Sequence, residues 1–158
     1  MNECTFDDLQ AGQRYTSAGI TLTEAAMVDF ALSYDPQPIH VDAHAAAGGP
    51  FGGLIASGIH TLAICCRLVQ LTKPWVAACL GSPGIDELRW LKPVRAGDTL
   101  HVVTEIRELR PSRSRPDRGT VLLRHEVINQ DGEVVLTFNI PELVARRAGS
   151  TTERAPAP

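Results

Sequence analysis

The chain has 158 residues, of which 44% are hydrophobic and 21% are charged, and its formal net charge is −3. This length suits one domain with a substantial apolar core and is too short for two domains of ordinary size. The small negative charge gives no electrostatic reason to expect nucleic acid as a partner. No run of eighteen apolar residues occurs, and the first residues are polar and acidic. We therefore expect no membrane span, no secretory signal and a cytoplasmic location.

The cysteines and histidines do not form a metal-binding pattern. Four cysteines lack the spacing typical of metal ligands: Cys4, Cys65, Cys66 and Cys79. The two adjacent cysteines are expected to be reduced core residues. His40 and His44 lie close together in the sequence, but His40 follows a proline-broken stretch and no second group of ligands stands out. We therefore predict no metal site.

The first elements in chain order are a short strand over residues 13–20 and a helix ending near residue 33. Thr21 or Thr23 can cap this helix, and Thr21 with Glu24 fits a capping box. Val28, Ala31 and Leu32 would form its inward face.

The helix leads into residues 35–40, which read DPQPIH. Pro36 and Pro38 fix their own φ angles and restrict the residues before them, so we expect a rigid, non-helical turn. This turn would hold a carboxylate, Asp35, near an imidazole, His40. Such a pair can transfer protons near neutral pH. The alternative is structural: Asp35 brackets the turn and His40 is a hydrogen-bonded core residue.

Two helices follow. Asp42 is expected to cap a short helix over residues 44–47, and Ser57 a longer one that ends before Pro74. Apolar residues occupy most of the circumference of the longer helix, which predicts burial nearly all round. If Ser57 is the cap, the N–H of Gly58 has no partner within the helix and could bind an oxyanion.

Beyond Pro74 the pattern changes to strands, expected over residues 84–90, 99–109, 119–129 and 133–144, with a hairpin turn at residues 129–132. Helices followed by an antiparallel meander indicate an α+β fold. Residues 107–118 contain five arginines and are expected to form a long loop, which is either a solvated surface or a phosphate-binding patch. We expect one domain over residues 1–145 and a disordered tail over residues 146–158.

Two separated segments resemble the MaoC-like dehydratase family. The first comprises residues 35–40 and the segment FGGLIASG at residues 51–58, and it resembles the hydratase 2 motif. The second is LKPVRAGDTL at residues 91–100. The resemblance covers most of residues 6–144. It implies a hot-dog fold, in which an antiparallel sheet wraps around a long central helix, and a homodimer or a dimer of dimers.

The resemblance also implies an activity, the addition or removal of water on a 2-enoyl or 3-hydroxyacyl thioester. The acyl group would arrive on coenzyme A, or on an acyl carrier, and no cofactor would be needed. Asp35 and His40 match the catalytic aspartate and histidine of the family, and Gly58 matches the glycine whose amide binds the thioester oxygen. Five further positions are candidates for contacting the substrate: Gln37, Pro38, Gly53, Ser57 and His60.

Two features keep other interpretations open. Gln37 stands where the family has asparagine, which keeps open a non-catalytic hot-dog protein that binds acyl thioesters or completes a heterodimer. A thioesterase on the same fold is a second enzymatic alternative, which the Asp35–His40 turn fits less well than hydration. His60 falls in the first turn of the long helix, where it either lines the substrate path or packs in the core.

Overall fold

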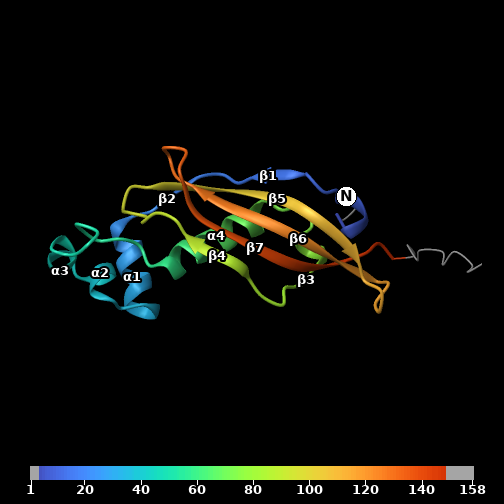
Figure 1. Cartoon of the computed structure of the whole chain (residues 1–158), viewed down its shortest axis with the longest axis horizontal. Helices are drawn as coiled ribbons and strands as arrows, with labels where there is room; N and C mark the ends of the chain where they lie inside the picture. Colours follow the sequence, from blue (N-terminus) through green and yellow to red (C-terminus); the bar gives the residue numbers. More distant parts are fainter. Residues whose placement is uncertain (1–3, 149–158) are drawn as a thin grey trace, which may run out of the picture.

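Three long antiparallel strands form the centre of the sheet (Figure 1). In the computed structural model, which describes residues 4–148, they are β5 (Thr99–Pro111), β6 (Arg118–Ile128) and β7 (Val134–Ala145). Side chains along β6 alternate between buried and half-exposed, as expected for a strand that covers a core with one face. The sequence predicted all three strands to within two residues of these bounds.

Four shorter strands flank this centre. β1 (Arg14–Thr16) and β2 (Ile20–Thr21) pair with β5, whereas β3 (Cys79–Gly81) and β4 (Asp86–Trp90) pair with β7. The single strand predicted over residues 13–20 is therefore divided into two. The division occurs at Ser17, whose side-chain oxygen, rather than its carbonyl, accepts the hydrogen bond from the Val102 N–H. The sequence did not predict β3.

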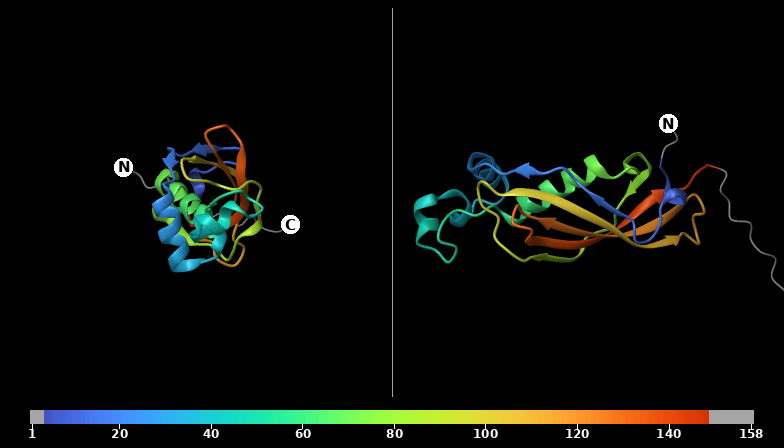
Figure 2. Two further views of the ribbon diagram at one scale, coloured as in Figure 1. Left: turned by 90° about the vertical axis from the view of Figure 1, so that its left-hand side faces the viewer. Right: turned by 90° about the horizontal axis from the view of Figure 1, so that it is seen from above.

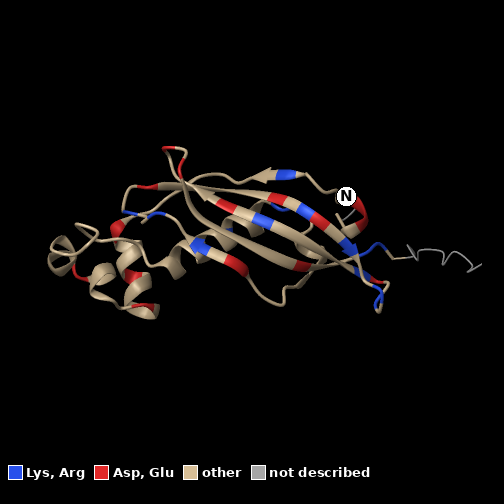
Figure 3. Cartoon of the chain, viewed as in Figure 1, with Lys and Arg blue, Asp and Glu red and all other residues tan. Residues whose placement is uncertain are grey.

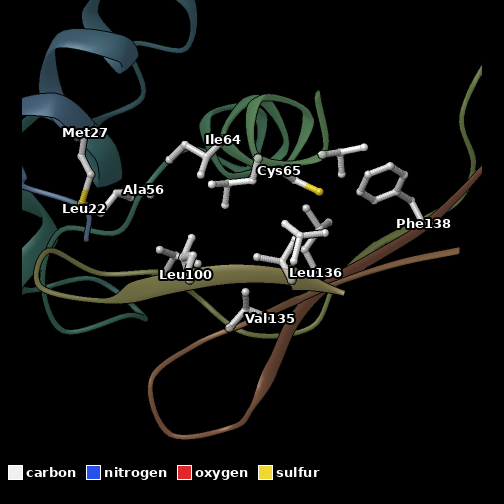
Figure 4. Packing of buried hydrophobic residues seen from close by; sticks show 14 residues of the cluster. Leu22, Met27, Ala56, Ile64, Cys65, Leu100, Val135, Leu136 and Phe138 are labelled. Carbon is white, nitrogen blue, oxygen red and sulfur yellow. The ribbon is translucent and has the colours of Figure 1, made fainter. Parts of the chain in front are cut away.

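The longest helix, α4 (Gly58–Thr72), packs against one face of the sheet (Figures 1 and 2). Ser57 caps it as predicted, because its Oγ accepts a hydrogen bond from the Ile59 N–H at 3.2 Å. Ile64 and Cys65 point from α4 towards Leu100 and Leu136 on the sheet (Figure 4). A sheet packed around one buried helix is the hot-dog fold, of the α+β class.

The predicted burial of α4 on nearly all sides is wrong for the single chain. One face is buried, and the opposite face is exposed along the whole helix: Ile59, Ala63, Arg67, Gln70 and Leu71. The sheet covers only one side of α4, so its outer side stays open.

Three helices precede α4 and lie beyond one end of the sheet (Figure 2). They are α1 (Glu24–Tyr34), α2 (Pro38–Val41) and α3 (Ala43–Ala47). The cap of α1 is Thr23 rather than Thr21, since the Thr23 Oγ1 accepts from the Ala26 N–H. Leu32 was predicted to face inward but is 61% exposed, whereas Ala31 is fully buried. Asp42 caps α3 as predicted.

The prolyl turn contains a short helix that the sequence analysis excluded. Residues 35–37 form a tight turn, in which the Gln37 N–H donates to the Asp35 carbonyl oxygen at 2.8 Å. Gln37 is the N-cap of α2, and Pro38 is its first residue. Proline is acceptable there because the first N–H of a helix has no intrahelical partner to lose. His40 is therefore on a helical turn that directly follows the turn carrying Asp35.

A second apolar cluster lies near the opposite end of the sheet from α1–α3. The short 3-10 helix η1 (Phe6–Asp8) places Phe6 against the sheet, and a second one, η2 (Val76–Ala78), follows the buried Trp75. A Cβ at position 119 of β6 would lie 2.3 Å from the Phe6 ring. Glycine at this position is what allows Phe6 to pack on β6.

Most of the predicted C-terminal tail, residues 149–158, lies outside the described residues. The first two residues of this tail, Arg146 and Arg147, contact the folded domain through ion pairs. Arg146 forms an ion pair with Asp7 at 2.6 Å, and Arg147 forms one with Asp8 at 2.6 Å. The folded part therefore extends at least two residues past β7.

Half of the arginine-rich segment is strand, and the loop between the two strands is shorter than predicted. β5 continues to Pro111 and β6 begins at Arg118, so only residues 112–117 form the turn. Ion pairs to acidic neighbours engage Arg107, Arg110 and Arg118. The turn lies at the end of the molecule opposite to α1–α3 (Figure 3).

Within residues 4–148, no helix is long and apolar enough to cross a membrane.

Candidate active site

A cavity of about 430 Å³ opens where α2, the start of α4 and the segment after β4 meet. It brings the two sequence motifs together, because its lining includes residues from both. The polar lining residues are Asp35, Gln37, His40, Thr61 and Lys92, and most of the remaining lining is apolar: Phe51, Ile55, Ala56, Ile59, Trp90, Leu91, Pro93 and Val94. An apolar cavity with a few convergent polar groups is the usual form of a small-molecule site.

Asp35 follows the last residue of α1, and two side chains hold its carboxylate. The Ser57 hydroxyl donates to Oδ2 at 2.6 Å, and the Gln37 amide donates to Oδ1 at 2.8 Å. These hydrogen bonds, that of Ser57 first, lower the pKa of Asp35 below its ordinary value, because they stabilise the charged form. Asp35 is therefore an oriented anion at neutral pH.

His40 is 5% exposed and is oriented by the main chain. Its Nδ1 lies 2.8 Å from the carbonyl oxygen of Ile55. A carbonyl oxygen only accepts hydrogen bonds, so Nδ1 carries the proton. In the neutral imidazole, Nε2 then has a free lone pair, and it lies 3.5 Å from Asp35 Oδ2.

Two acceptors consequently face each other across this short gap. At 3.5 Å they do not form a good direct hydrogen bond, and two lone pairs do not attract each other. A water molecule can satisfy both by donating one hydrogen to Asp35 Oδ2 and the other to His40 Nε2. The geometry therefore suits binding a water with its oxygen directed into the cavity.

Gly58 is the first residue of α4 and lines the same cavity. Its N–H has no hydrogen-bond acceptor within residues 4–148. The N-terminus of a helix carries partial positive charge, which favours an oxygen that develops negative charge. The carbonyl of Gly58 accepts from the indole Nε1 of Trp90 at 2.9 Å.

The other predicted positions lie around the cavity rather than in it, apart from Gln37. Ser57 is fully buried behind Asp35. Pro38 begins α2, and Gly53 lies in the loop before α4 with φ of 150°. His60 faces α1, where its ring stacks on Phe30 with centroids 4.4 Å apart. The Nδ1 of His60 is buried and has no hydrogen-bond partner.

Two residues that support the site were not predicted from the sequence. Trp90 ends β4 and packs on Gly58. Arg95 reaches back across the cavity rim, where its guanidinium donates to the carbonyl oxygens of Phe51 and Leu54. Arg95 belongs to the second motif, at residues 91–100, and Trp90 directly precedes it. Their position in or next to this motif was the only sequence feature that could have indicated them.

None of the described residues form a group of three or more His, Cys, Asp or Glu side chains that could hold a metal ion. All four cysteines are free. Burial raises the pKa of Cys66, which is half-buried on α4. A thiol with a raised pKa is a poor nucleophile. The chemistry of the cavity is thus that of a carboxylate, an imidazole and a backbone amide.

Comparison with known families and proteins agrees with this chemistry. The family described as "MaoC like domain" matches residues 8–128. The uncharacterized protein YdeM of Bacillus subtilis is 32% identical over 140 residues, which cover 89% of this chain and 98% of YdeM. The 3-hydroxybutyryl-CoA dehydratase of Methylorubrum extorquens is 30% identical over 132 residues, covering 83% of this chain and 82% of that enzyme.

The solved structures similar to this chain include a MaoC-like dehydratase and an R-hydratase. A MaoC-like dehydratase from Rhodospirillum rubrum superposes with a TM-score of 0.86 at 42% identity, covering 91% of this chain and 98% of that one. An unliganded R-hydratase from Pseudomonas aeruginosa has a TM-score of 0.74 at 28% identity, with 98% and 93% coverage. A Mycobacterium tuberculosis protein with a double hot-dog fold matches at 23% identity and a TM-score of 0.76, and it supports the fold alone; the match covers 98% of this chain and 52% of that one.

Proposed function

Because the chain belongs to the MaoC-like domain family, we propose that it is a hydro-lyase acting on acyl thioesters. It adds water to a 2-enoyl thioester or removes water from a 3-hydroxyacyl thioester, with coenzyme A as the carrier. The observation that carries this proposal is the pair of facing acceptors, Asp35 Oδ2 and His40 Nε2, 3.5 Å apart beside the free N–H of Gly58.

In the hydration direction, the water held by Asp35 and His40 attacks C3 of the enoyl group. Its oxygen forms the new C3–O bond, and His40 Nε2 takes one of its protons. The electron pair of the C2=C3 double bond moves towards C2 and the thioester oxygen. A hydrogen bond from the Gly58 N–H stabilises the negative charge that develops on this oxygen. The pair then returns a proton to C2, so the elements of water have added across the double bond.

The roles of the two side chains differ. The Asp35 carboxylate is a weak base, because the Ser57 and Gln37 hydrogen bonds lower its pKa. It orients the water and stabilises the imidazolium that forms next to it. His40 is the better proton acceptor, since its Nε2 has a free lone pair and its other nitrogen is fixed to the Ile55 carbonyl.

Two observations support coenzyme A thioesters as substrates, one on the cavity and one on a relative. The cavity has the size and apolar lining expected of an acyl-binding site. The relative from Methylorubrum extorquens is named for 3-hydroxybutyryl-CoA. Gln37 is compatible with the proposal, since its amide donates to Asp35 Oδ1 at 2.8 Å and helps to hold the carboxylate in the cavity.

The decisive experiment follows crotonyl-CoA by two readouts at once. Hydration removes the absorbance of the conjugated enoyl thioester and leaves the thioester bond intact, so absorbance should fall while no free thiol appears. Release of free thiol would indicate a thioesterase. Binding of crotonyl-CoA without either change would identify a non-catalytic acyl-thioester-binding protein.

We further propose that the protein acts as a homodimer, or as a dimer of dimers. The outer side of α4 and the strands that follow it expose large apolar side chains, including Leu71, Val76 and Leu80. A second copy would cover this surface.

A further inference from the structure

We propose that Trp90 is the specificity-determining residue of this cavity, and that its indole excludes acyl groups branched at C2. The proposal rests on the acyl-thioester function above and adds the class of acyl group accepted, one that is unbranched next to the thioester carbon. It is built on the packing of Trp90 against Gly58 and on the position of both residues in the cavity lining.

The indole of Trp90 is in direct contact with the backbone of Gly58. Its Nε1 donates to the Gly58 carbonyl oxygen at 2.9 Å. A Cβ built on Gly58 would lie 2.6 Å from Nε1 and 2.7 Å from Cε2. These separations are far below van der Waals contact, so the ring occupies the space where any side chain at position 58 would be.

The position of this ring is fixed by the sheet. Trp90 pairs with Leu136 of β7, and the next residue, Leu91, donates its N–H to the Val135 carbonyl at 2.8 Å. A side chain held by strand pairing on one side and by its own hydrogen bond to α4 on the other has little freedom to move aside. Half of Trp90 is nevertheless exposed, and it lines the cavity. The indole therefore forms a fixed part of the cavity wall.

The indole of Trp90 lies beside the position that the reacting part of the substrate would occupy. A thioester oxygen bound to the Gly58 N–H lies about 3 Å from that nitrogen. C2 of the acyl group is two bonds from the oxygen, so a substituent on C2 lies close to Gly58. Because the indole packs on Gly58 and lines the cavity, a substituent on that side of C2 would meet it.

The indole of Trp90 would discriminate between branched and unbranched acyl groups by shape. Ile59, Leu91 and Pro93 also line the cavity and are apolar, and the charged Lys92 of the same lining is paired with Glu133. In an apolar cavity, one methyl group that cannot be accommodated typically changes affinity by about tenfold or more. We therefore expect an aliphatic branch at C2 to be rejected by the bulk of the ring.

The test measures binding of two saturated thioesters, butyryl-CoA and 2-methylbutyryl-CoA, by titration calorimetry. Neither can be hydrated, so the measurement does not depend on catalysis. The parent protein should bind butyryl-CoA at least about tenfold more tightly, and Trp90→Ala should bring the two Kd values within about threefold of each other. Trp90→Phe removes the indole N–H but keeps a ring, so it should keep the preference.

Two further variants complete the design. Trp90→Leu keeps an apolar side chain on β4 and replaces Trp90→Ala if the latter does not fold. Leu32→Ala removes an exposed apolar side chain of α1, outside the cavity, and should leave the preference unchanged. If the ratio of Kd values stays that of the parent in Trp90→Ala or Trp90→Leu, Trp90 does not set the specificity and the proposal is wrong.

Hydration of crotonyl-CoA is measured in parallel, so that the two proposals fail separately. A parent protein that does not hydrate crotonyl-CoA contradicts the hydratase function, whereas loss of the butyryl-CoA preference in Trp90→Ala still supports the role of Trp90. A parent protein that binds neither saturated thioester, or binds both equally, contradicts the role of Trp90, and the hydration readout decides the hydratase function separately.

The packing itself has an independent test in melting temperature. Gly58→Ala should lower Tm by at least about 3 °C, because its methyl group overlaps the indole. In a Trp90→Ala background, the same change should have a much smaller effect. Equal losses of Tm in the two backgrounds would show that the indole does not pack on Gly58, and would remove the basis of the proposal.

Discussion

The Asp35 carboxylate and the His40 imidazole are held by different parts of the chain. Asp35 depends on the side chains of Ser57 and Gln37, whereas His40 depends on the carbonyl oxygen of Ile55. Neither residue contributes to the apolar core formed by α4 and the sheet. Substitutions that keep the shape of these side chains should therefore change the chemistry and leave the fold intact.

Asp35→Asn and His40→Gln are the first such substitutions. Each removes one of the two groups that hold and deprotonate water, so hydration should fall by at least about a hundredfold in either variant. The double variant should be little worse than the poorer single one, because the two groups act as a unit. Steady-state kinetics with crotonyl-CoA measure these effects. A His40→Gln variant as fast as the parent would refute the catalytic assignment.

Ser57→Ala tests the support of Asp35. Loss of the strongest hydrogen bond to the carboxylate raises the pKa of Asp35 from its lowered value, so the acidic limb of the kcat/KM profile should move to higher pH. The same change removes the N-cap of α4 and should cost about 1 kcal/mol of stability.

Thr23→Ala is the matched control for Ser57→Ala. Thr23 caps α1 but does not contact Asp35, so its loss should lower Tm without moving the pH profile. An unchanged acidic limb in Ser57→Ala would mean that protonation of Asp35 does not limit the reaction.

The sequence predicted that Asp35 and His40 lie close together, but not all of the contacts that support them. Asp35 and His40 lie within six residues, so their proximity was readable from the chain. Ser57 was predicted as a helix cap, but its hydrogen bond to Asp35 spans 22 residues and depends on how α4 packs beside α1. Trp90 reaches Gly58 only because β4 pairs with β7. Contacts of this kind follow from tertiary structure, which local patterns do not specify.

At the scale of the elements, the end of α4 is joined to β7 by a buried ionic cluster. The Nζ of Lys73 lies 2.6 Å from Glu142 Oε1, and the indole of Trp75 donates to Oε2 at 2.9 Å. Both charged side chains are almost completely buried, with 1% and 6% of their surface exposed. Because each neutralises the other, the cluster tolerates burial only while both are present.

Glu142→Gln should therefore be strongly destabilising. It leaves the Lys73 ammonium buried without a counter-charge, at a cost of about 3–5 kcal/mol in the free energy of unfolding. The matched control is Glu133→Gln, which breaks the exposed ion pair between Glu133 and Lys92 and should change stability little. Urea denaturation of both variants measures the difference. Equal stability losses would show that burial of the cluster is not what makes it important.

His125 on β6 adds a pH dependence to the stability of the sheet. Burial, with a smaller effect of the nearby Lys73, lowers the pKa of His125 from its ordinary 6.5 to about 4. Between these values the unfolded chain binds a proton that the folded chain does not. The contribution of His125 to stability is therefore present above pH 6.5 and is lost as pH falls from about 6.5 to about 4.

The loss amounts to about 3 kcal/mol across this window. His125→Gln should remove most of the His125 contribution to the slope while keeping a partner for the Thr104 hydroxyl, which lies 2.9 Å from His125 Nδ1. Urea midpoints at pH 7.5, 5.5 and 4.5 would show the change, with the parent losing stability more steeply. His60, whose pKa is also lowered by burial, leaves a smaller residual slope in the variant. The same slope in both proteins would contradict the prediction.

The elements themselves show where sequence patterns were sufficient and where they were not. The long strands were predicted closely because apolar residues alternate along β5 and β6 and produce alternating burial, which is a strong local signal. The arginine-rich segment was predicted as a loop because of its charge, yet β5 extends into it as far as Pro111, and Arg110 and Glu108 form an ion pair along this exposed strand end. Leu32 was placed inward by helical periodicity, but α1 lies beyond the sheet and buries only part of that face.

At the scale of the whole molecule, the exposed apolar residues are unevenly distributed. Among the described residues, seven of the ten large apolar side chains that are exposed come from α4 and the segment that follows it: Ile59, Leu71, Val76, Leu80, Ile85, Trp90 and Leu91. The strands β3 and β4 lie at an edge of the sheet, because both pair only with β7. An apolar surface beside an open strand edge is suited to pairing with another protein chain.

The protein should therefore be a dimer, or a dimer of dimers, at micromolar concentration. Light scattering should give a mass at least twice the chain mass of 17.1 kDa. Leu80→Asp introduces a charge on the exposed side of β3 and should shift the protein to monomers, because a charge buried at an interface without a partner is strongly unfavourable. Leu32→Asp on α1 changes a more exposed leucine away from this edge and should leave the assembly intact. A monomeric parent protein would contradict the prediction, and dissociation by Leu32→Asp instead of Leu80→Asp would place the interface on the α1 side of the molecule.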